Sequence, residues 1–135
     1  MFAIKSEVTD PHAETFSFAK QKTMYGGKLI AQGDIIFIFA SENEGGSGLI
    51  ALGTVTTASS VPKTPGIARQ TPRVNIIVRR TALAKRRLGR TELKAHSKWN
   101  DGKPETELNF KFYRQATDKI VGISPVTAAF LHGFF

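Results

Sequence analysis

The fold of this chain is most readily inferred from the run Gln32-Gly33-Asp34-Ile35-Ile36-Phe37-Ile38-Phe39-Ala40-Ser41. Ile35 to Phe39 are five consecutive bulky residues, all β-branched or aromatic, and the run is too short for a buried helix. Turn-forming residues bound it at Gly33-Asp34 and from Ser41 to Gly48. The pattern predicts a strand that is buried on both faces. Such a strand lies in a barrel or in a sheet sandwiched by helices.

Further strands are predicted on either side of this run. Alternating apolar and polar residues indicate strands in three segments, residues 1–7, 73–80 and 108–114. In the last segment, Leu108, Phe110 and Phe112 are expected to point inward. Residues 49–56 return as the second strand of a hairpin with the central run. Three prolines between residues 62 and 72 mark a connector that has neither helical nor strand periodicity.

Two helices are predicted from their first residues. Asp10-Pro11 and Ser124-Pro125 each place an N-cap residue before a proline at the first helical position. They predict a helix over residues 11–24 and a second helix that ends the chain. Thr81 is a candidate cap for one or two further helical turns through Leu88.

Five strands and two or three short helices, joined by hairpins rather than by regular strand–helix alternation, predict an α+β domain built round a small, partly closed β-barrel. At 135 residues, residues 1–135 are expected to form a single domain. The sequence has no cysteine, no run of 18 or more apolar residues and no export signal at its N-terminus. These features predict a cytoplasmic protein that does not span a membrane.

The net charge of +8 is concentrated in one part of the chain. Residues 63–103 carry twelve basic and two acidic side chains, whereas residues 1–62 have a net charge of −2 and residues 104–135 a net charge of zero. Such a block attracts polyanions, nucleic acid first and anionic membrane second. The alternative is a solvated surface that keeps the protein soluble.

The basic block is dense enough to neutralise several phosphates. Its central members are Arg79, Arg80, Lys85, Arg86, Arg87, Arg90, Lys94 and Lys98. Trp99 follows directly, and it is interpreted either as a residue on which a base stacks or as a packing residue at the rim of the core. Lys111, Tyr113 and Arg114, on the outward face of the predicted strand 108–114, would add to this surface.

The sequence contains no clear signature of an enzyme, metal site or cofactor. His12, His96 and His132 are far apart in sequence, so we predict no metal site. The loop Gly45-Gly46-Ser47-Gly48 lacks the lysine and the following helix of a phosphate-binding P-loop. No Gly-x-Ser-x-Gly elbow or carboxylate pair indicates a catalytic residue.

The central run and its return strand resemble PUA-like proteins, and EVE domains most closely. The resemblance is carried by Gln32 to Ser41 and by Gly48-Leu49-Ile50-Ala51-Leu52-Gly53-Thr54-Val55. It implies an open barrel of five or six strands with helices plugging it. In such families a pocket accepts a nucleobase, often modified, that is flipped from DNA or RNA. EVE domains typically end the Gly-Asp strand with an aromatic-His-Ser triplet, and Ala40 stands here in place of the histidine.

We therefore expect a nucleic-acid-binding module. Basic side chains between Arg73 and Lys98 would hold phosphates, and a pocket near Ser6, Phe39, Ser41 and Trp99 would receive a base.

Two alternatives remain open. One is a small ASCH-like amidohydrolase acting on a modified nucleoside, for which Lys5, Glu7 and Thr23 are the candidate residues. The other is a protein-interaction domain whose basic face meets an acidic partner.

Overall fold

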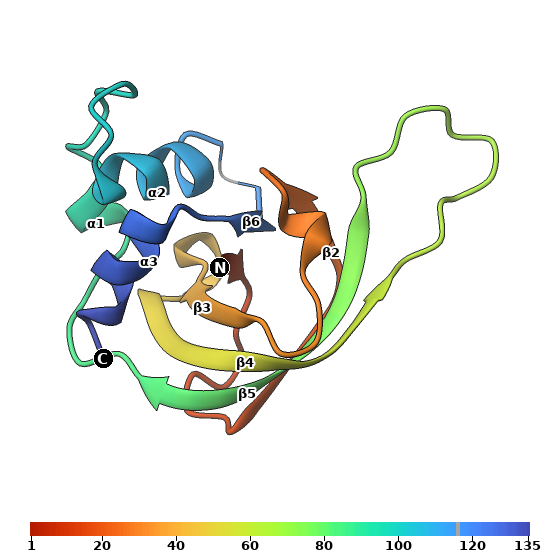
Figure 1. The fold of residues 1–135 in the computed structure, drawn as a ribbon, viewed down its shortest axis with the longest axis horizontal. Helices are drawn as coiled ribbons and strands as arrows, with labels where there is room; N and C mark the ends of the chain where they lie inside the picture. Colours follow the sequence, from red (N-terminus) through yellow and green to blue (C-terminus); the bar gives the residue numbers. More distant parts are fainter. Residues whose placement is uncertain (116) are drawn as a thin grey trace.

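The computed structural model describes residues 1–115 and 117–135, and in these ranges six strands close into one barrel in the order β1-β3-β4-β5-β2-β6 (Figure 1). The strands are β1 (Phe2–Ser6), β2 (Thr15–Met24), β3 (Ile35–Ala40), β4 (Gly48–Ser60), β5 (Arg73–Leu83) and β6 (Lys119–Gly122). The other elements are the short turns η1 (Gly27–Leu29) and η2 (Glu42–Glu44) and the helices α1 (Arg90–Leu93), α2 (Pro104–Phe112) and α3 (Pro125–His132). The predicted α+β barrel is confirmed, and it is closed rather than partly open because β6 bridges β1 and β2.

β3 is buried on both faces, as its sequence predicts. Ile36 and Ile38 belong to the core inside the barrel, whereas Phe37 and Phe39 belong to a second core beneath the helices. All four side chains are fully buried. Burial of one such side chain contributes about 1.5 to 3 kcal/mol to stability. Because its two faces belong to different cores, this strand joins the two cores.

β2 corrects the predicted helix over residues 11–24. Phe16 and Phe18 are buried while Thr15 and Ser17 are exposed, so the segment has the period of a strand. Asp10 does not cap a helix, because its Oδ1 accepts a hydrogen bond from the backbone N–H of His12 (3.0 Å) within a turn. A register shift between Phe18 and Gln21 then bends the strand.

α2 corrects the predicted strand over residues 108–114. Pro104 occupies the first helical turn, and Lys111 pairs with Glu107 one turn earlier (2.9 Å). Leu108 and Phe112, four residues apart, are fully buried on one side of the helix. Phe110 is only half-buried, because a helix turns the intervening position away from the core.

The segment after β5 also differs from its prediction. β5 continues through Leu83, so Thr81 does not begin a helix, and the short helix α1 starts only at Arg90. The predicted C-terminal helix is confirmed as α3, whose cap Ser124 Oγ accepts a hydrogen bond from the backbone N–H of Thr127 (3.2 Å). No helix in the described ranges is long and apolar enough to cross a membrane.

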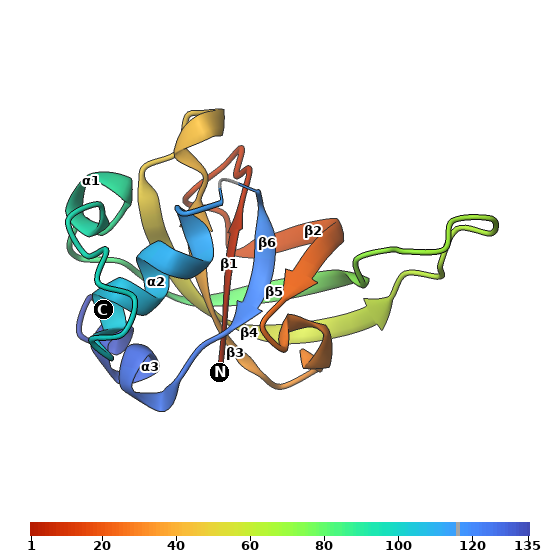
Figure 2. The same ribbon diagram turned by 90° about the horizontal axis from the view of Figure 1, so that it is seen from above.

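The connector (residues 62–72) projects from the barrel. β4 pairs with β3 only as far as Thr54, and then continues beside β5 to Ser60. The connector joins the ends of these two strands without helix or strand of its own, as predicted. It stands out to one side of the molecule in both ribbon views (Figures 1 and 2).

Candidate functional site

One end of the barrel, which we call the barrel mouth, gathers polar side chains from segments far apart in sequence. β1 and β3 run parallel, with Ser6 opposite Ala40, so their carboxyl ends lie together. The backbone N–H of Ser41 donates to the carbonyl of Ser6 (2.9 Å) just beyond this pair. β6 runs antiparallel to β1 and begins at the same end, where η2 also lies (Figure 2).

A cavity of about 430 Å³ opens at the barrel mouth. Its walls are formed by polar and charged residues from β1, β2, η2, β5 and the segment before β6. They are Ser6, Glu7, Lys20, Gln21, Lys22, Asn43, Glu44, Arg73, Thr117 and Asp118. The cavity therefore combines hydrogen-bonding groups with charges of both signs, and its size lies in the range of small-molecule sites.

Two buried lysines lie next to this cavity. Lys5 and Lys119 are cross-strand neighbours on β1 and β6, and both are at most 1% exposed. Lys119 Nζ donates to the carbonyls of Gln115 (3.1 Å) and Thr117 (3.0 Å), while Lys5 Nζ lies 3.9 Å from Asp118 Oδ1. Burial lowers the pKa of Lys5, and burial together with repulsion from Lys5 lowers the pKa of Lys119 to about 8.

Three carboxyl groups meet at the cavity: Glu7, Glu44 and Asp118. A hydrogen bond with Asp118, followed by burial and by the charge of Asp118, raises the pKa of Glu44 to about 7, and Glu7 acts in the same direction. Glu44 can therefore carry a proton near neutral pH. A carboxyl group that is partly protonated can donate a hydrogen bond as well as accept one.

Ser41 has an unusual environment at this end of the barrel. Its side chain is buried, and among the described residues its Oγ is the one buried side-chain oxygen or nitrogen without a hydrogen-bond partner. A buried hydroxyl left in this state costs about 1 to 3 kcal/mol. A hydrogen bond from any ligand or water that reaches this hydroxyl would remove that cost.

The four residues predicted for the base pocket do not form one site. Ser6 and Ser41 lie together at the barrel mouth. Phe39 is fully buried in the core, where its ring packs 5.1 Å from that of Phe112. Trp99 lies in the segment between α1 and α2, and its ring contacts Phe110 edge-on at 5.3 Å.

Trp99 lines a second cavity of about 360 Å³, together with residues of α2. Its side chain is 45% exposed, so it is neither a core residue nor part of the barrel mouth. The guanidinium of Arg114 lies 4.9 Å from the ring of Phe110 and 5.9 Å from that of Trp99. The aromatic pair is thus already covered in part by a cation from its own chain.

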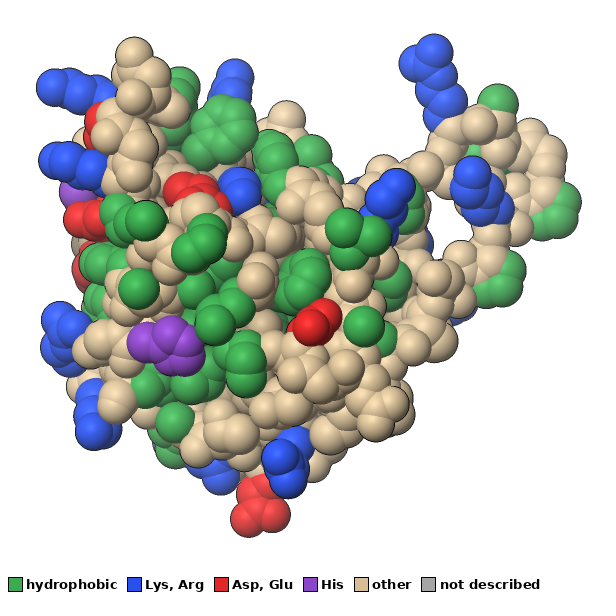
Figure 3. Space-filling model, viewed as in Figure 1, with side chains coloured by type: hydrophobic (Ala, Val, Ile, Leu, Met, Phe, Trp, Pro, Cys, Tyr) green, Lys and Arg blue, Asp and Glu red, His purple; other side chains and the backbone are tan. Residues whose placement is uncertain are grey.

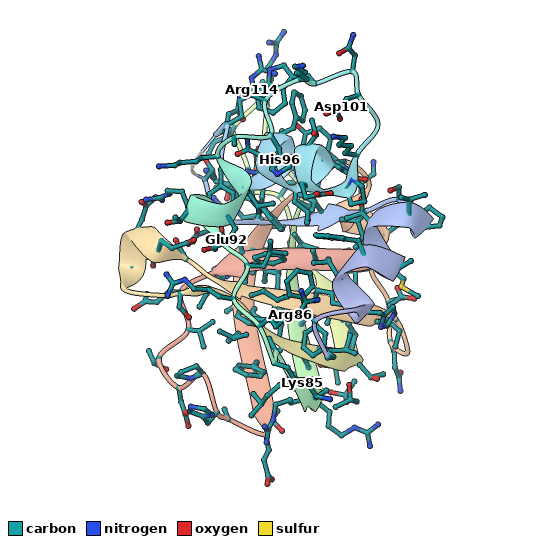
Figure 4. The ribbon with its side chains drawn as sticks, turned by 90° about the vertical axis from the view of Figure 1, so that its left-hand side faces the viewer. Lys85, Arg86, Glu92, His96, Asp101 and Arg114 are labelled. Atoms are coloured by element: carbon teal, nitrogen blue, oxygen red, sulfur yellow. The ribbon has the colours of Figure 1, made fainter. Side chains whose placement is uncertain are left out.

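The basic side chains are spread over opposite sides of the molecule rather than gathered at a point. Figure 3 shows Lys and Arg side chains along the edge beside α1 and α2, with others on the projecting connector. In Figure 4, Lys85 and Arg86 lie at one end of this edge and Arg114 lies at the other. The exposed members of the predicted set are Arg79, Lys85, Arg86, Arg87, Arg90, Lys94 and Lys98, whereas Arg80 is half-buried.

Three of these arginines have structural contacts. Arg87 Nε lies 3.7 Å from Glu92 Oε2. Arg86 donates to the carbonyl of Gly133 (2.9 Å) and lies 4.3 Å from the ring of Phe134, so it holds the C-terminal segment. Arg90 donates to Asn43 Oδ1 (2.6 Å), which places it at the rim of the barrel mouth.

The candidate residues of the hydrolase alternative do not converge on the cavity. Glu7 lines it, but the side chain of Lys5 is fully buried below. The hydroxyl of Thr23 donates to the carbonyl of Pro72 (2.8 Å).

Sequence reasoning missed Lys20 and Lys22, because β2 was predicted as a helix, and Asp118 and Lys119, because β6 was not predicted. The only available signal was the alternation of Phe16 and Phe18, which indicates a strand.

No protein-family model matches the chain, and a search of curated proteins finds no match. Among solved structures, the DUF55 domain of human thymocyte nuclear protein 1 is similar, with a TM-score of 0.64 and 14% identity over 98% of this chain and 96% of that one. The same human protein in complex with DNA containing 5-methylcytosine gives a TM-score of 0.63 and 15% identity, over 98% of this chain and 95% of that one. A protein from Pseudomonas putida gives a TM-score of 0.61 and 14% identity, over 98% and 97% of the two chains. The chain therefore has the same fold as the human DUF55 domain, and the nearer resemblance to EVE domains stays a prediction.

Proposed function

We propose that the protein binds nucleic acid and receives a modified or flipped base at the barrel mouth. The observation that carries this proposal is the polar cavity of about 430 Å³, whose lining includes both carboxyl groups and basic side chains. Lys20, Lys22 and Arg73 line the cavity, and Arg90 is hydrogen-bonded to the lining residue Asn43. Cations at a rim suit phosphates, whereas carboxylates repel phosphates and suit the edge of a base.

The carboxyl groups indicate what kind of base edge would fit. A carboxylate accepts hydrogen bonds from an exocyclic amino group, such as N4 of cytosine. Glu44, whose pKa is raised to about 7, can also donate to a ring nitrogen or a carbonyl oxygen when it is protonated. The human protein with the same fold was crystallised with DNA containing 5-methylcytosine, which supports a base of this type as the first to test.

A base can enter the barrel mouth only if it leaves its stack. Extrusion costs a few kcal/mol, and least for a base that is single-stranded, mismatched or damaged. Hydrogen bonds to Glu7 and Glu44, which line the cavity, would offset part of this cost. We expect a preference for bases that are already weakly paired.

The test is fluorescence anisotropy with labelled single- and double-stranded DNA and RNA, with and without modified bases, at two salt concentrations. Each phosphate contact should add about 0.7 to 0.9 to the slope of log affinity against log salt. Glu44→Ala should reduce the affinity for probes that contain a cytosine or 5-methylcytosine while leaving the salt slope unchanged. Glu105→Ala removes a carboxylate that lies outside the cavity, and it should leave both quantities unchanged. Absence of binding to every probe would contradict the proposal.

A further inference from the structure

The connector forms a third cavity, the connector cavity, directly beside the barrel mouth. This cavity is about 550 Å³ in volume and is lined mainly by connector residues. Lys20 and Arg73 line both this cavity and the one at the barrel mouth. A guanidinium nitrogen of Arg73 donates to the carbonyl of Lys20 (2.7 Å), which fixes the shared wall. A chain leaving the barrel mouth on this side would therefore meet the connector next.

The connector is held in shape by one glutamine. Gln70 Oε1 accepts from the backbone N–H of Thr64 (2.8 Å), and Gln70 Nε2 donates to the carbonyls of Thr64 (2.8 Å) and Ile67 (3.1 Å). The three prolines restrict the backbone further, because each fixes its own φ angle. A loop that is ordered before binding loses less conformational entropy when a ligand arrives.

The charged side chains of the connector and of its flanking strands are all positive. From Gly45 to Thr91 the sequence contains nine basic residues and no acidic residue. Lys63 and Arg69 line the connector cavity, where they join Lys20 and Arg73. Figure 3 shows Lys and Arg side chains on the connector, which stands away from the body of the molecule. Such a surface complements a polyanion.

We infer that the connector binds the sugar-phosphate backbone of the same nucleic-acid strand whose base enters the barrel mouth. The inference rests on the proposed function and assigns phosphate binding to Lys63 and Arg69, which belong to the basic block of residues 63–103 but precede the stretch from Arg73 to Lys98 that was predicted to hold phosphates. Four cations then follow the strand from the mouth outward: Lys20, Arg73, Lys63 and Arg69. The acidic side chains that line the mouth receive the base, and the acid-free connector receives the phosphates.

The first test compares two double variants by salt-dependent binding. Lys63→Gln with Arg69→Gln removes two connector charges and leaves Arg73 and Gln70 in place. Lys28→Gln with Lys103→Gln removes two exposed charges that line neither the connector cavity nor the cavity at the barrel mouth. Loss of two phosphate contacts should lower the salt slope by about 1.4 to 1.8 in the connector variant, and the control should keep the slope of the wild type.

The outcomes separate this inference from the proposed function. If the wild type binds and the connector variant keeps its salt slope, the connector role is overturned while the proposed function stands. If the wild type shows no salt-dependent binding to any nucleic acid, both are overturned. Gln70→Ala changes no charge, so it should weaken binding at an unchanged salt slope, and unaltered affinity would overturn the role given to the ordered loop.

A second test locates the strand, and it uses the absence of native cysteine. A cleavage reagent tethered to Ala68→Cys should cut nucleotides that flank the modified base on one side only. The same reagent at Ser97→Cys, between α1 and α2, should give a different pattern. Cleavage from position 68 that bears no relation to the modified base would overturn the inference.

Discussion

Replacement of Glu107 by glutamine should destabilise the protein in a manner that depends on pH. Glu107 Oε1 accepts hydrogen bonds from the hydroxyls of Ser124 and Thr127, both 2.6 Å long. Its Oε2 accepts from Lys111 Nζ (2.9 Å) and from the backbone N–H of Ser124 (3.0 Å). One carboxylate thus joins α2 to the first turn of α3.

The magnitude follows from the pKa of this carboxyl group. Burial by itself would raise the pKa of Glu107, but hydrogen bonds from Ser124, Thr127 and Lys111 outweigh burial and lower the pKa from 4.5 to about 2. Each pKa unit corresponds to about 1.4 kcal/mol, so the ionised form would stabilise the fold by about 3 kcal/mol. The side chain is 19% exposed and glutamine keeps some of the hydrogen bonds, so we expect a loss of about 2 kcal/mol at neutral pH.

The pH dependence has a definite sign. Because the pKa is lowered in the folded state, this stabilisation is fully present above the ordinary pKa of 4.5 and disappears as the pH falls towards about 2. Urea unfolding of the wild type and of Glu107→Gln should therefore differ most near neutral pH and converge in acid. Glu105→Gln on the same helix is the matched control, with an expected change within about 0.5 kcal/mol. An equal difference between wild type and Glu107→Gln at all pH values would refute the reasoning.

The remaining predictions concern one core phenylalanine, one exposed tryptophan, one buried lysine and one glycine. Phe39→Ala should cost about 3 to 5 kcal/mol in urea unfolding because the ring is fully buried, and a small loss would contradict its place in the core. Trp99→Ala, at an exposed position, should cost much less in the same experiment. Lys119 has its pKa lowered from 10.5 to about 8, so the unfolded chain binds more protons between these values and stability should rise with pH across this window. Lys119→Met should reduce that rise, as measured by unfolding at several pH values. Gly48→Ala should lower the melting temperature, because φ is +85° and a methyl group would clash with the Leu88 carbonyl; an unchanged value would contradict this.

The sequence predicts those elements whose local pattern agrees with their tertiary environment. Ile35 to Phe39 are apolar on both faces because a barrel interior covers one face and a layer of helices covers the other. A run of five such residues is too short for a buried helix, so it predicts a strand. α3 is signalled by its own cap, Ser124-Pro125, and by apolar residues at helical spacing. Both predictions depend on residues near each other in sequence.

Two segments were predicted wrongly because the spacing of their apolar residues fits both a helix and a strand. In β2, Phe16 with Ala13 and Ala19 suggests a helix, whereas Phe16 with Phe18 suggests a strand. In α2, the alternation of Leu108, Phe110 and Phe112 suggests a strand, although Leu108 and Phe112 are also spaced to lie on one face of a helix. Packing on the rest of the chain decides between these patterns, and sequence periodicity alone does not contain that information.

The candidate site was harder to predict than the fold, because it is assembled by long-range pairing. The carboxyl ends of β1 and β3 meet only because these strands run parallel, and Asp118 reaches the mouth only because β6 closes the barrel. Ser6 and Ser41, two of the four residues named for the base pocket, are neighbours at the mouth, and their role in binding a base stays a prediction. Trp99 was assigned to the same pocket because of its chemistry, and its position in the α1–α2 segment separates it from the mouth.

The central claim is that a base leaves the stack and enters the barrel mouth. The most direct test places the fluorescent base 2-aminopurine next to a modified cytosine in a DNA duplex and records its emission as protein is added. Emission should rise as binding saturates, because extrusion of the cytosine removes a stacking partner of the probe. The rise should be smaller with Glu44→Ala at saturating protein. Saturable binding without any change in emission would contradict the claim, since the duplex would then be bound with its bases stacked.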